Sequence, residues 1–185
     1  MPTSIGHTLA GVFLKETRIF TPAETAFKSL LVSVILANLA DIDFLPGLIL
    51  GNPNRFHHGI THSLGATLVA GLVFGFYFYA KKNQFWAPFS FSGLLYLSHV
   101  ALDFLTVDTS PPQGVPIFWP LSGEYYLSPI SVFSSVHKDS FSATFFQSLF
   151  VSENIGTVFR EIFILGPFVL LVYLVKLIKN KIQPA

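Results

Sequence analysis

Acidic and imidazole side chains gather in one segment of the chain, residues 37–63, with the sequence ANLADIDFLPGLILGNPNRFHHGITHS. Only 11% of all residues are charged, against roughly 25% in an average soluble domain. In so apolar a setting these groups are costly unless they are paired, protonated or bound to a metal ion. We therefore interpret the segment as half of a metal site. Its candidate residues are Asp41, Asp43, His57, His58 and His62.

The other half of the predicted site is the pair His99 and Asp103 in YLSHVALDFLT. A spacing of four residues places both side chains on one face of a helix, where they can hold one ion together. The alternative is a buried hydrogen bond between the two, which fastens this helix to a neighbour. We favour the metal site because a chance pair is less common deep in an apolar run than in a soluble protein.

Three histidines within six residues, HHGITHS, indicate metal binding. His58 and His62 have helical spacing, whereas His57 lies in a predicted loop, where spacing constrains little. We select His57 and His62 as ligands, although the choice between His57 and His58 stays open. The alternative is a polar loop at the membrane interface. Arg55, just before them, is a candidate for binding an anionic oxygen of a substrate, or else an anchor to lipid headgroups.

Asp41 and Asp43 stand two residues apart at the end of a predicted helix. Both can reach one ion at a fraying helix end, or one can bind the ion while the other orients a histidine. A carboxylate that does not bind the ion could act as general base, which makes both aspartates candidate catalytic residues. The alternative for each is helix capping and solvation at the interface.

The chain contains no cysteine, so histidines and carboxylates are its only strong metal ligands. Nitrogen and oxygen ligands suit Zn²⁺, with Mn²⁺ and Fe²⁺ as alternatives, in a hydrolytic centre of one or two ions. The sequence has no GxSxG, HExxH or P-loop motif, so no other catalytic machinery is indicated. The formal net charge of +1 predicts no binding to nucleic acid.

Long apolar runs predict how these residues are positioned. Residues 63–80 and 85–102 contain no Asp, Glu, Lys or Arg, and residues 162–175 form a third such run. Since about 20 apolar residues span a bilayer, we predict an all-α integral membrane bundle of about five helices in a single domain, residues 1–185. The predicted helices are 5–18, 22–40, 61–80, 85–106 and 157–179.

The predicted helices are joined and interrupted by recognisable signals. Thr21 and Glu24 form a capping box, with Pro22 at the first helical position. Residues 107–156 form a predicted irregular excursion on the extracytoplasmic side, which contains a short amphipathic helix at 140–152. Gly166 and Pro167 predict a kink in the last helix.

Five alternating helices sort the charged residues to opposite ends of the bundle. One end collects eight of the eleven basic residues, whereas the other collects all five Asp and all six His. By the positive-inside rule the basic end is cytoplasmic. The sequence therefore predicts a multi-pass protein of the cell membrane with its site at the extracytoplasmic side. His7 joins the candidate metal ligands because this arrangement places it at the same end.

Together these pieces resemble the YdjM-like family of membrane-bound metal-dependent hydrolases. The matching motifs follow the same order over about residues 1–130: IGHTLAG, LADIDFLPG, HHGITHS, HVALDFLT, and GVPIFWPLS at 114–122. The chain departs from the family pattern at position 58, where Arg is frequent, and at VDTSPPQ, which delays the last motif. The resemblance implies a metal site that consists of His7, Asp41 or Asp43, His57, His62, His99 and Asp103.

The family is distantly similar to zinc-dependent phospholipase C and related nucleases, which implies hydrolysis of phosphoesters. A site at the membrane surface then favours a phospholipid or lipid-linked phosphate as substrate, with the lipid bilayer as partner. Two alternatives stay open: a non-enzymatic membrane protein that binds or carries metal ions, and purely structural polar packing. A carrier is expected to have polar residues along several helices. The sequence does not indicate an oligomeric state.

Overall fold

Helices dominate the described part of the chain. The computed structural model describes residues 1–17, 26–109 and 112–182, and no β-strand occurs among them. Two isolated bridges, Thr106 with Phe133 and Val115 with Tyr126, are the only β-type pairs in those ranges. The all-α fold class is therefore confirmed. The elements are α1 (Ser4–Thr17), α2 (Ala26–Ala37), η1 (Leu39–Asp43), α3 (Phe44–Ile49), η2 (Pro53–Arg55), α4 (Leu64–Lys82), α5 (Trp86–Phe104), α6 (Ser142–Ser148) and α7 (Ser152–Ile182), where η denotes a 3₁₀-helix.

The predicted helix 22–40 is divided in the structure. α2 ends at Ala37, and the chain passes through Asn38 into the 3₁₀-helix η1 and then into the short helix α3. η1 carries both candidate aspartates and lies against α5. The capping box predicted at Thr21 and Glu24 lies outside the described residues.

The other predicted helices correspond to α1, α4, α5 and α7, with ends that differ by a few residues. α7 begins at Ser152 and stays helical through Pro167. α6 corresponds to the short helix predicted at 140–152, whereas the first residues of α7 lie inside the range 107–156 that was predicted to be irregular.

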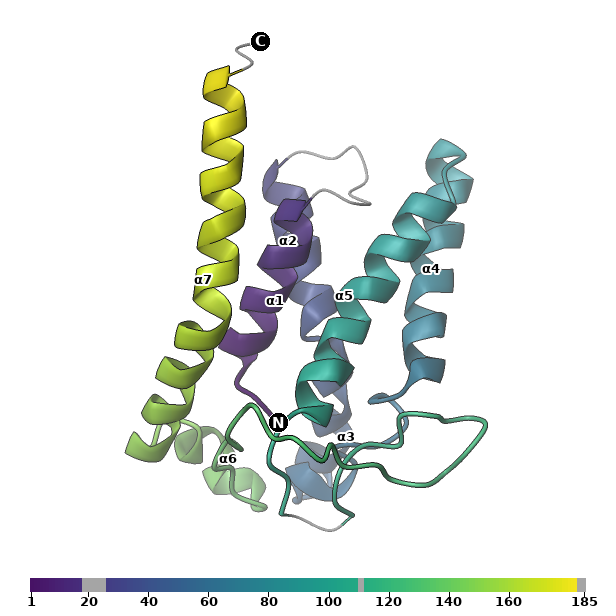
Figure 1. Cartoon of the computed structure of the whole chain (residues 1–185). Coiled ribbons are helices and arrows are strands. Elements are labelled where there is room, and N and C mark those ends of the chain that lie inside the picture. The colour runs from purple at the N-terminus through teal and green to yellow at the C-terminus, as the bar shows by residue number, and fades with distance from the viewer. Residues whose placement is uncertain (18–25, 110–111, 183–185) are drawn as a thin grey trace.

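α5 is the central helix of the bundle and packs against α1, α2 and α4 (Figure 1). Its Leu95 is fully buried and packs against Leu36 of α2. α4 lies close beside α5 because Gly75 leaves room for the ring of Phe85, which a Cβ at Gly75 would approach to 2.8 Å. Small residues at such contacts are typical of helices that associate in a membrane. The tight packing fixes the face of α5 that carries the candidate ligands.

Two buried glutamates attach α7 to α1. Glu161 of α7 is fully buried and accepts hydrogen bonds from the backbone N–H of Thr3, at 2.6 Å, and from the Thr3 hydroxyl group. Near the other end of α1, Glu16 forms an ion pair with Lys176 and accepts a hydrogen bond from the Tyr173 hydroxyl at 3.2 Å. α1 is therefore held at both ends.

Two of the described helices, α4 and α7, are long and apolar enough to cross a membrane. A third span results if Phe27–Ala37 and Leu39–Ile49, which meet at a bend of 54°, are taken as one broken span. The predicted five spans are thus not confirmed. α5 carries the buried polar side chains of Ser92, His99 and Asp103, which lower its hydropathy and give it the character of an internal helix.

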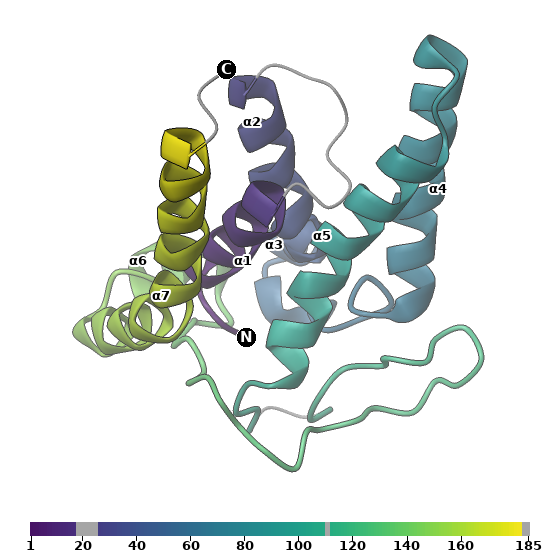
Figure 2. The same ribbon diagram turned by 45° about the horizontal axis from the view of Figure 1, so that its top comes forward.

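The three helix ends that carry lysines lie at the same end of the bundle, far from the candidate site. The last turns of α1, α4 and α7 carry Lys15, Lys81 with Lys82, and Lys179 with Lys181. Figure 1 shows these three helix ends at the top of the bundle and α3, α6 and the long connections at the bottom. In Figure 2, turned by 45°, the ends of α4 and α7 again lie high in the view and the long connection after α5 lies at the bottom.

Candidate metal centre

Four ligand atoms from three separate elements converge at the lower end of α5. Asp103 Oδ2 of α5 lies 3.0 Å from His62 Nε2 and 3.1 Å from His99 Nε2. The two histidine nitrogens are 3.2 Å apart. Asp41 Oδ1 of η1 lies 3.5 Å from His99 Nε2 and 3.8 Å from His62 Nε2. These four residues form a group that could hold a metal ion.

Several buried atoms of this cluster have no hydrogen-bond partner in the described ranges. They include both carboxylate oxygens of Asp103, Oδ1 of Asp41, and Nε2 of both His57 and His58. Buried polar atoms in native proteins are nearly always hydrogen-bonded. The chemistry of these atoms, carboxylate oxygens and imidazole nitrogens, is that of metal ligands. The residues therefore fit a bound divalent cation.

Hydrogen bonds behind the two central histidines fix their orientation. His99 Nδ1 donates to the carbonyl of Ala37 at 2.8 Å, one of the terminal carbonyls that α2 leaves unpaired. This bond leaves the lone pair on Nε2, which faces the cluster. His62 Nδ1 lies 3.1 Å from Asp43 Oδ2, and the adjacent Ser63 caps α4 by accepting a hydrogen bond from the N–H of Ala66. Such supporting bonds are usual behind metal-binding histidines.

Asp43 supports two histidines at once. Its Oδ1 lies 3.1 Å from His57 Nδ1, and its Oδ2 lies 3.1 Å from His62 Nδ1. The Thr61 hydroxyl also donates to Oδ2 at 2.8 Å. Asp41, by contrast, directs an unpartnered oxygen at the cluster. This difference matches the second possibility considered for the pair, in which one aspartate faces the ion and the other orients a histidine.

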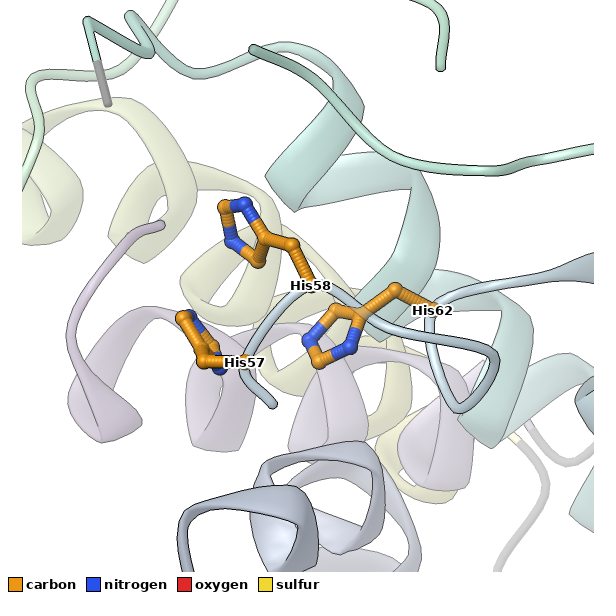
Figure 3. A group of neighbouring side chains, drawn as sticks. All are labelled: His57, His58 and His62. Atoms are coloured by element: carbon orange, nitrogen blue, oxygen red, sulfur yellow. The ribbon is translucent and has the colours of Figure 1, made fainter. Parts of the chain in front are cut away.

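The loop before α4 brings His57, His58 and His62 together (Figure 3). Their ring centroids are 4.1–5.0 Å apart, and the three form a second group that could hold an ion. His57 also forms a third group with Asp41 and Asp43. Asp41, His57 and His62 each belong to two of these groups, so the three groups overlap.

His58 adopts a backbone conformation that few non-glycine residues use, with φ of 59°. Its Nδ1 lies 3.3 Å from Asp108 Oδ2, which also accepts a hydrogen bond from the Gly114 N–H at 2.8 Å. The first N–H groups of the next helix, those of Leu64 and Gly65, bond to the carbonyls of Ile117 and Trp119. Segment 114–122 is therefore packed against the start of α4 beside the histidine loop.

His7 of α1 reaches the site but belongs to none of the three groups. Its ring stacks on His99 with centroids 3.7 Å apart, and its Nε2 lies 3.6 Å from Asp103 Oδ1. It is fully buried, and neither ring nitrogen has a hydrogen-bond partner among the described residues. All seven residues predicted as metal ligands are thus brought together, with His7 beside the ligand atoms rather than among them.

Burial keeps two of the loop histidines neutral. It lowers the pKa of His57 well below its ordinary value, and the neighbouring charges of Lys138 and His58 lower it further. Burial also lowers the pKa of His58, although the hydrogen bond to Asp108 acts in the opposite direction. A neutral imidazole is the form that binds a metal ion.

His62 behaves differently because carboxylates surround it. Burial alone would lower its pKa, but the carboxylates of Asp103, Asp41 and Asp43 beside its ring outweigh burial and raise the pKa well above the ordinary value. The position of His62 therefore attracts positive charge strongly. Either a proton or a metal ion can supply that charge.

A large open cavity of about 1310 Å³ leads to this cluster and is lined by Asp43, His57 and His58. Arg55, the candidate substrate-binding residue, is exposed and lines the same cavity. Its guanidinium carbon lies 5.4 Å from the centre of the Phe56 ring. The cavity is large enough to admit an organic ligand to the cluster.

A family model described as YdjM inner membrane protein matches residues 1–181. The chain belongs to this family. The match extends the resemblance of the motifs from about the first 130 residues to nearly the whole chain. No match occurs among curated proteins or among solved structures. Membership in a family of inner membrane proteins agrees with the apolar helices α4 and α7.

Some residues of this YdjM-family site were not predicted from the sequence. Thr61 lies within the HHGITHS motif, so the motif itself held a signal for it. Asp108 and Lys138 belong to the irregular excursion, where no periodicity indicates which side chains point inward. Outside the site, Glu161 is one carboxylate in an apolar helix, and such a residue is a signal for a buried partner.

Proposed function

We propose that this member of the YdjM family is a membrane-bound metal-dependent hydrolase of phosphoesters. The observation that carries the proposal is the set of buried ligand atoms that face one another without partners in the described part of the chain. An unsatisfied buried polar group costs about 1–3 kcal/mol. Purely structural packing leaves that cost in place for several atoms at once, whereas a bound cation removes it.

Zn²⁺ is the ion we propose, with Mn²⁺ and Fe²⁺ as alternatives. Ligand atoms about 2.0–2.1 Å from Zn²⁺ at tetrahedral angles stand about 3.3 Å apart. Five of the six separations among the ligand atoms of Asp41, His62, His99 and Asp103 are 3.0–3.8 Å and agree with that value. The overlapping group of His57, His58 and His62 supports a second ion.

When bound, a divalent ion supplies Lewis-acid activation of water and of a phosphoryl group. In our proposal His62, His99 and Asp103 hold that ion. Asp41 serves as the fourth ligand or as the base that accepts a proton from water, because its Oδ1 is unpartnered and faces the site. Asp43 orients His57 and His62, because its oxygens already contact both rings.

The substrate we propose is a lipid or lipid-linked phosphate. The wall of the cavity combines the cationic Arg55 with apolar side chains that remain more than half exposed, Ile42, Leu45 and Ile60. The neighbouring Ile49 of α3 is 85% exposed. A molecule that joins a phosphate to an apolar chain matches both parts of this wall, and such a molecule is available at the membrane surface.

We further propose a multi-pass arrangement with the site on the extracytoplasmic side. The lysines at the ends of α1, α4 and α7 support it, since positive residues favour the cytoplasmic side. The chain has no native cysteine, so labelling of single cysteines in intact cells tests this orientation. Ser135→Cys should react with an impermeant maleimide and Lys82→Cys should not; the opposite pattern would reverse the orientation.

The alternative function is a protein that binds or carries metal ions without catalysis. A carrier needs polar groups along its path through the bilayer. α4 contains no histidine or acid, and its only charged residues are Lys81 and Lys82 in the last turn. The polar residues are concentrated at one end, which favours a surface reaction over transport.

A hydrolysis assay tests the proposed function. The full chain in detergent, loaded with Zn²⁺, should hydrolyse phosphatidic acid or a chromogenic phosphoester. A chelator should abolish the activity and added Zn²⁺ should restore it. Asp103→Asn should lose roughly 100-fold or more of the rate. A protein that holds stoichiometric zinc and yet hydrolyses neither phosphomonoesters nor phosphodiesters faster than the chelated protein would exclude the proposal.

A further inference from the structure

Lys138 lines the cavity beside the candidate metal centre, on the connection that precedes α6. Its Nζ lies 5.1 Å from the centre of the Phe44 ring. That ring in turn stacks on the imidazole of His57, with centroids 4.0 Å apart. A lysine ammonium group therefore lies close to a candidate ligand, inside the space that a substrate would enter.

The charge of Lys138 has no direct counter-ion in the described ranges, where the ring of Phe44 is its contact. Asp103, Asp41 and Asp108 lie near enough to act on it through space, yet burial dominates and lowers the pKa of Lys138 to about 8. When a divalent cation neutralises those carboxylates, the ammonium group loses much of their attraction. An anion in the cavity would again place negative charge beside the ammonium group.

The backbone on both sides of Lys138 is held firmly. The His137 N–H donates to Asn154 Oδ1 at 2.7 Å, and Asn154 Nδ2 donates back to the His137 carbonyl at 2.8 Å. The Asp139 N–H donates to Ser148 Oγ at 2.8 Å. Asn154 and Ser148 are both buried. The connection is thus fixed to α6 and α7 at the residues that flank Lys138, and the direction in which Lys138 leaves the backbone is set.

We infer that Lys138 binds the phosphoryl oxygens of the substrate, with Arg55 at the outer part of the same cavity as its companion. This inference rests on the proposed function, which makes a phosphoryl group the ligand. The ammonium group offers three hydrogen-bond donors on a flexible stem, which suits a tetrahedral group of oxygens. A fixed positive charge beside the reacting phosphoryl group also stabilises negative charge that develops there.

Binding of inorganic phosphate to the zinc-loaded full chain in detergent, measured by calorimetry, tests the inference without catalysis. Lys138→Met keeps the apolar stem and removes the charge, so phosphate should bind about 10- to 100-fold more weakly. Lys138→Arg should recover most of the affinity. The zinc content should be the same in all of these proteins.

Lys82→Met is the matched control. Lys82 also rests near an aromatic ring, with Nζ 5.6 Å from the centre of Phe78, but it lies in the last turn of α4, away from the site. This variant should bind phosphate like the wild type. A second arm measures the KM for phosphatidic acid in mixed micelles. If Lys138→Met also raises this KM, lipid phosphate is a ligand of Lys138. If the variant weakens the binding of free phosphate but leaves the KM unchanged, the ligand is a soluble phosphate.

Three results would overturn the inference. They are unchanged phosphate affinity in Lys138→Met, loss of zinc from that variant, and no phosphate binding by the zinc-loaded wild type. Failure of the proposed function looks different. In that case the zinc-loaded wild type binds phosphate through Lys138 but hydrolyses no ester. The phosphate site is then supported, whereas the proposed reaction is not.

Discussion

His62 Nε2 and His99 Nε2 face each other at 3.2 Å, although one histidine belongs to the loop before α4 and the other to α5. Two imidazole nitrogens can approach so closely only with a proton or a metal ion between them, because two lone pairs repel. Asp103 Oδ2 lies within 3.1 Å of both nitrogens and adds negative charge. A change to any of these three residues should therefore alter the cation that the site holds.

Asp43→Asn tests the supporting role of Asp43. The substitution replaces a carboxylate that contacts His57 and His62 with an amide of the same shape. We expect metal affinity to fall by about 10- to 100-fold, as for other residues that orient metal-binding histidines. Competition with a chromophoric zinc chelator measures the change.

Asp139→Asn is the control for this prediction, since Asp139 lies on the connection outside the ligand groups. It should leave zinc affinity unchanged. If Asp43→Asn also binds zinc like the wild type, Asp43 does not support the site.

Metal affinity should rise with pH, because a proton on His62 competes with the ion. Carboxylates raise the pKa of His62 well above its ordinary value of about 6.5, so the metal-free protein keeps this proton above pH 6.5. Metal binding then releases at least one proton, and affinity should increase at least about tenfold per pH unit up to the raised pKa. Burial keeps His57 neutral over this range, so it adds no second proton.

The stability of the metal-free protein should change with pH in the opposite sense. Because the folded-state pKa of His62 is raised, protonated His62 contributes to the free energy of unfolding. This contribution is complete below about pH 6.5 and is lost as pH rises through the folded-state pKa. Thermal unfolding of chelated protein across this range measures the effect. Zinc affinity that does not depend on pH would contradict the protonation of His62.

Glu161→Ala should destabilise the contact between α1 and α7. The substitution removes a buried acceptor and leaves the N–H and hydroxyl group of the half-buried Thr3 without their partner, which costs about 1–3 kcal/mol. The thermal midpoint of the protein in detergent should fall. Zinc content should persist, because α1 contributes His7, which is outside the ligand groups.

Glu153→Ala in the first turn of α7 is the matched control for Glu161→Ala. Glu153 is exposed and bonds to its neighbour Ser152, so its loss should lower the midpoint much less. Equal midpoints for the two variants would show that the buried carboxylate does not hold α1 in place.

The sequence predicted much of this site because the relevant residues occur in local patterns. The four-residue spacing of His99 and Asp103 needs only a helix to bring them together, and α5 supplies it. The histidines of HHGITHS share one short loop, so their proximity also follows from local sequence. The apolar runs likewise indicated α4 and α7.

The parts that the sequence did not predict depend on tertiary packing. The break at Asn38, which places Asp41 and Asp43 in η1, carries no glycine or proline to indicate it. The inward position of Lys138 depends on Asn154 of α7, which a single sequence does not connect with it. The number of membrane spans also stays a prediction, because only α4 and α7 among the described helices meet the criteria of length and hydropathy on their own.

Metal analysis of gently purified protein tests the central claim most directly. The wild type should contain one or two zinc ions per chain, whereas Asp103→Asn and His62→Ala should lose most of the metal. His137→Ala, which removes a histidine whose side chain is 59% exposed, should keep it. Stoichiometric metal in Asp103→Asn and His62→Ala, or a wild type that stays metal-free with zinc supplied, would contradict the metal centre.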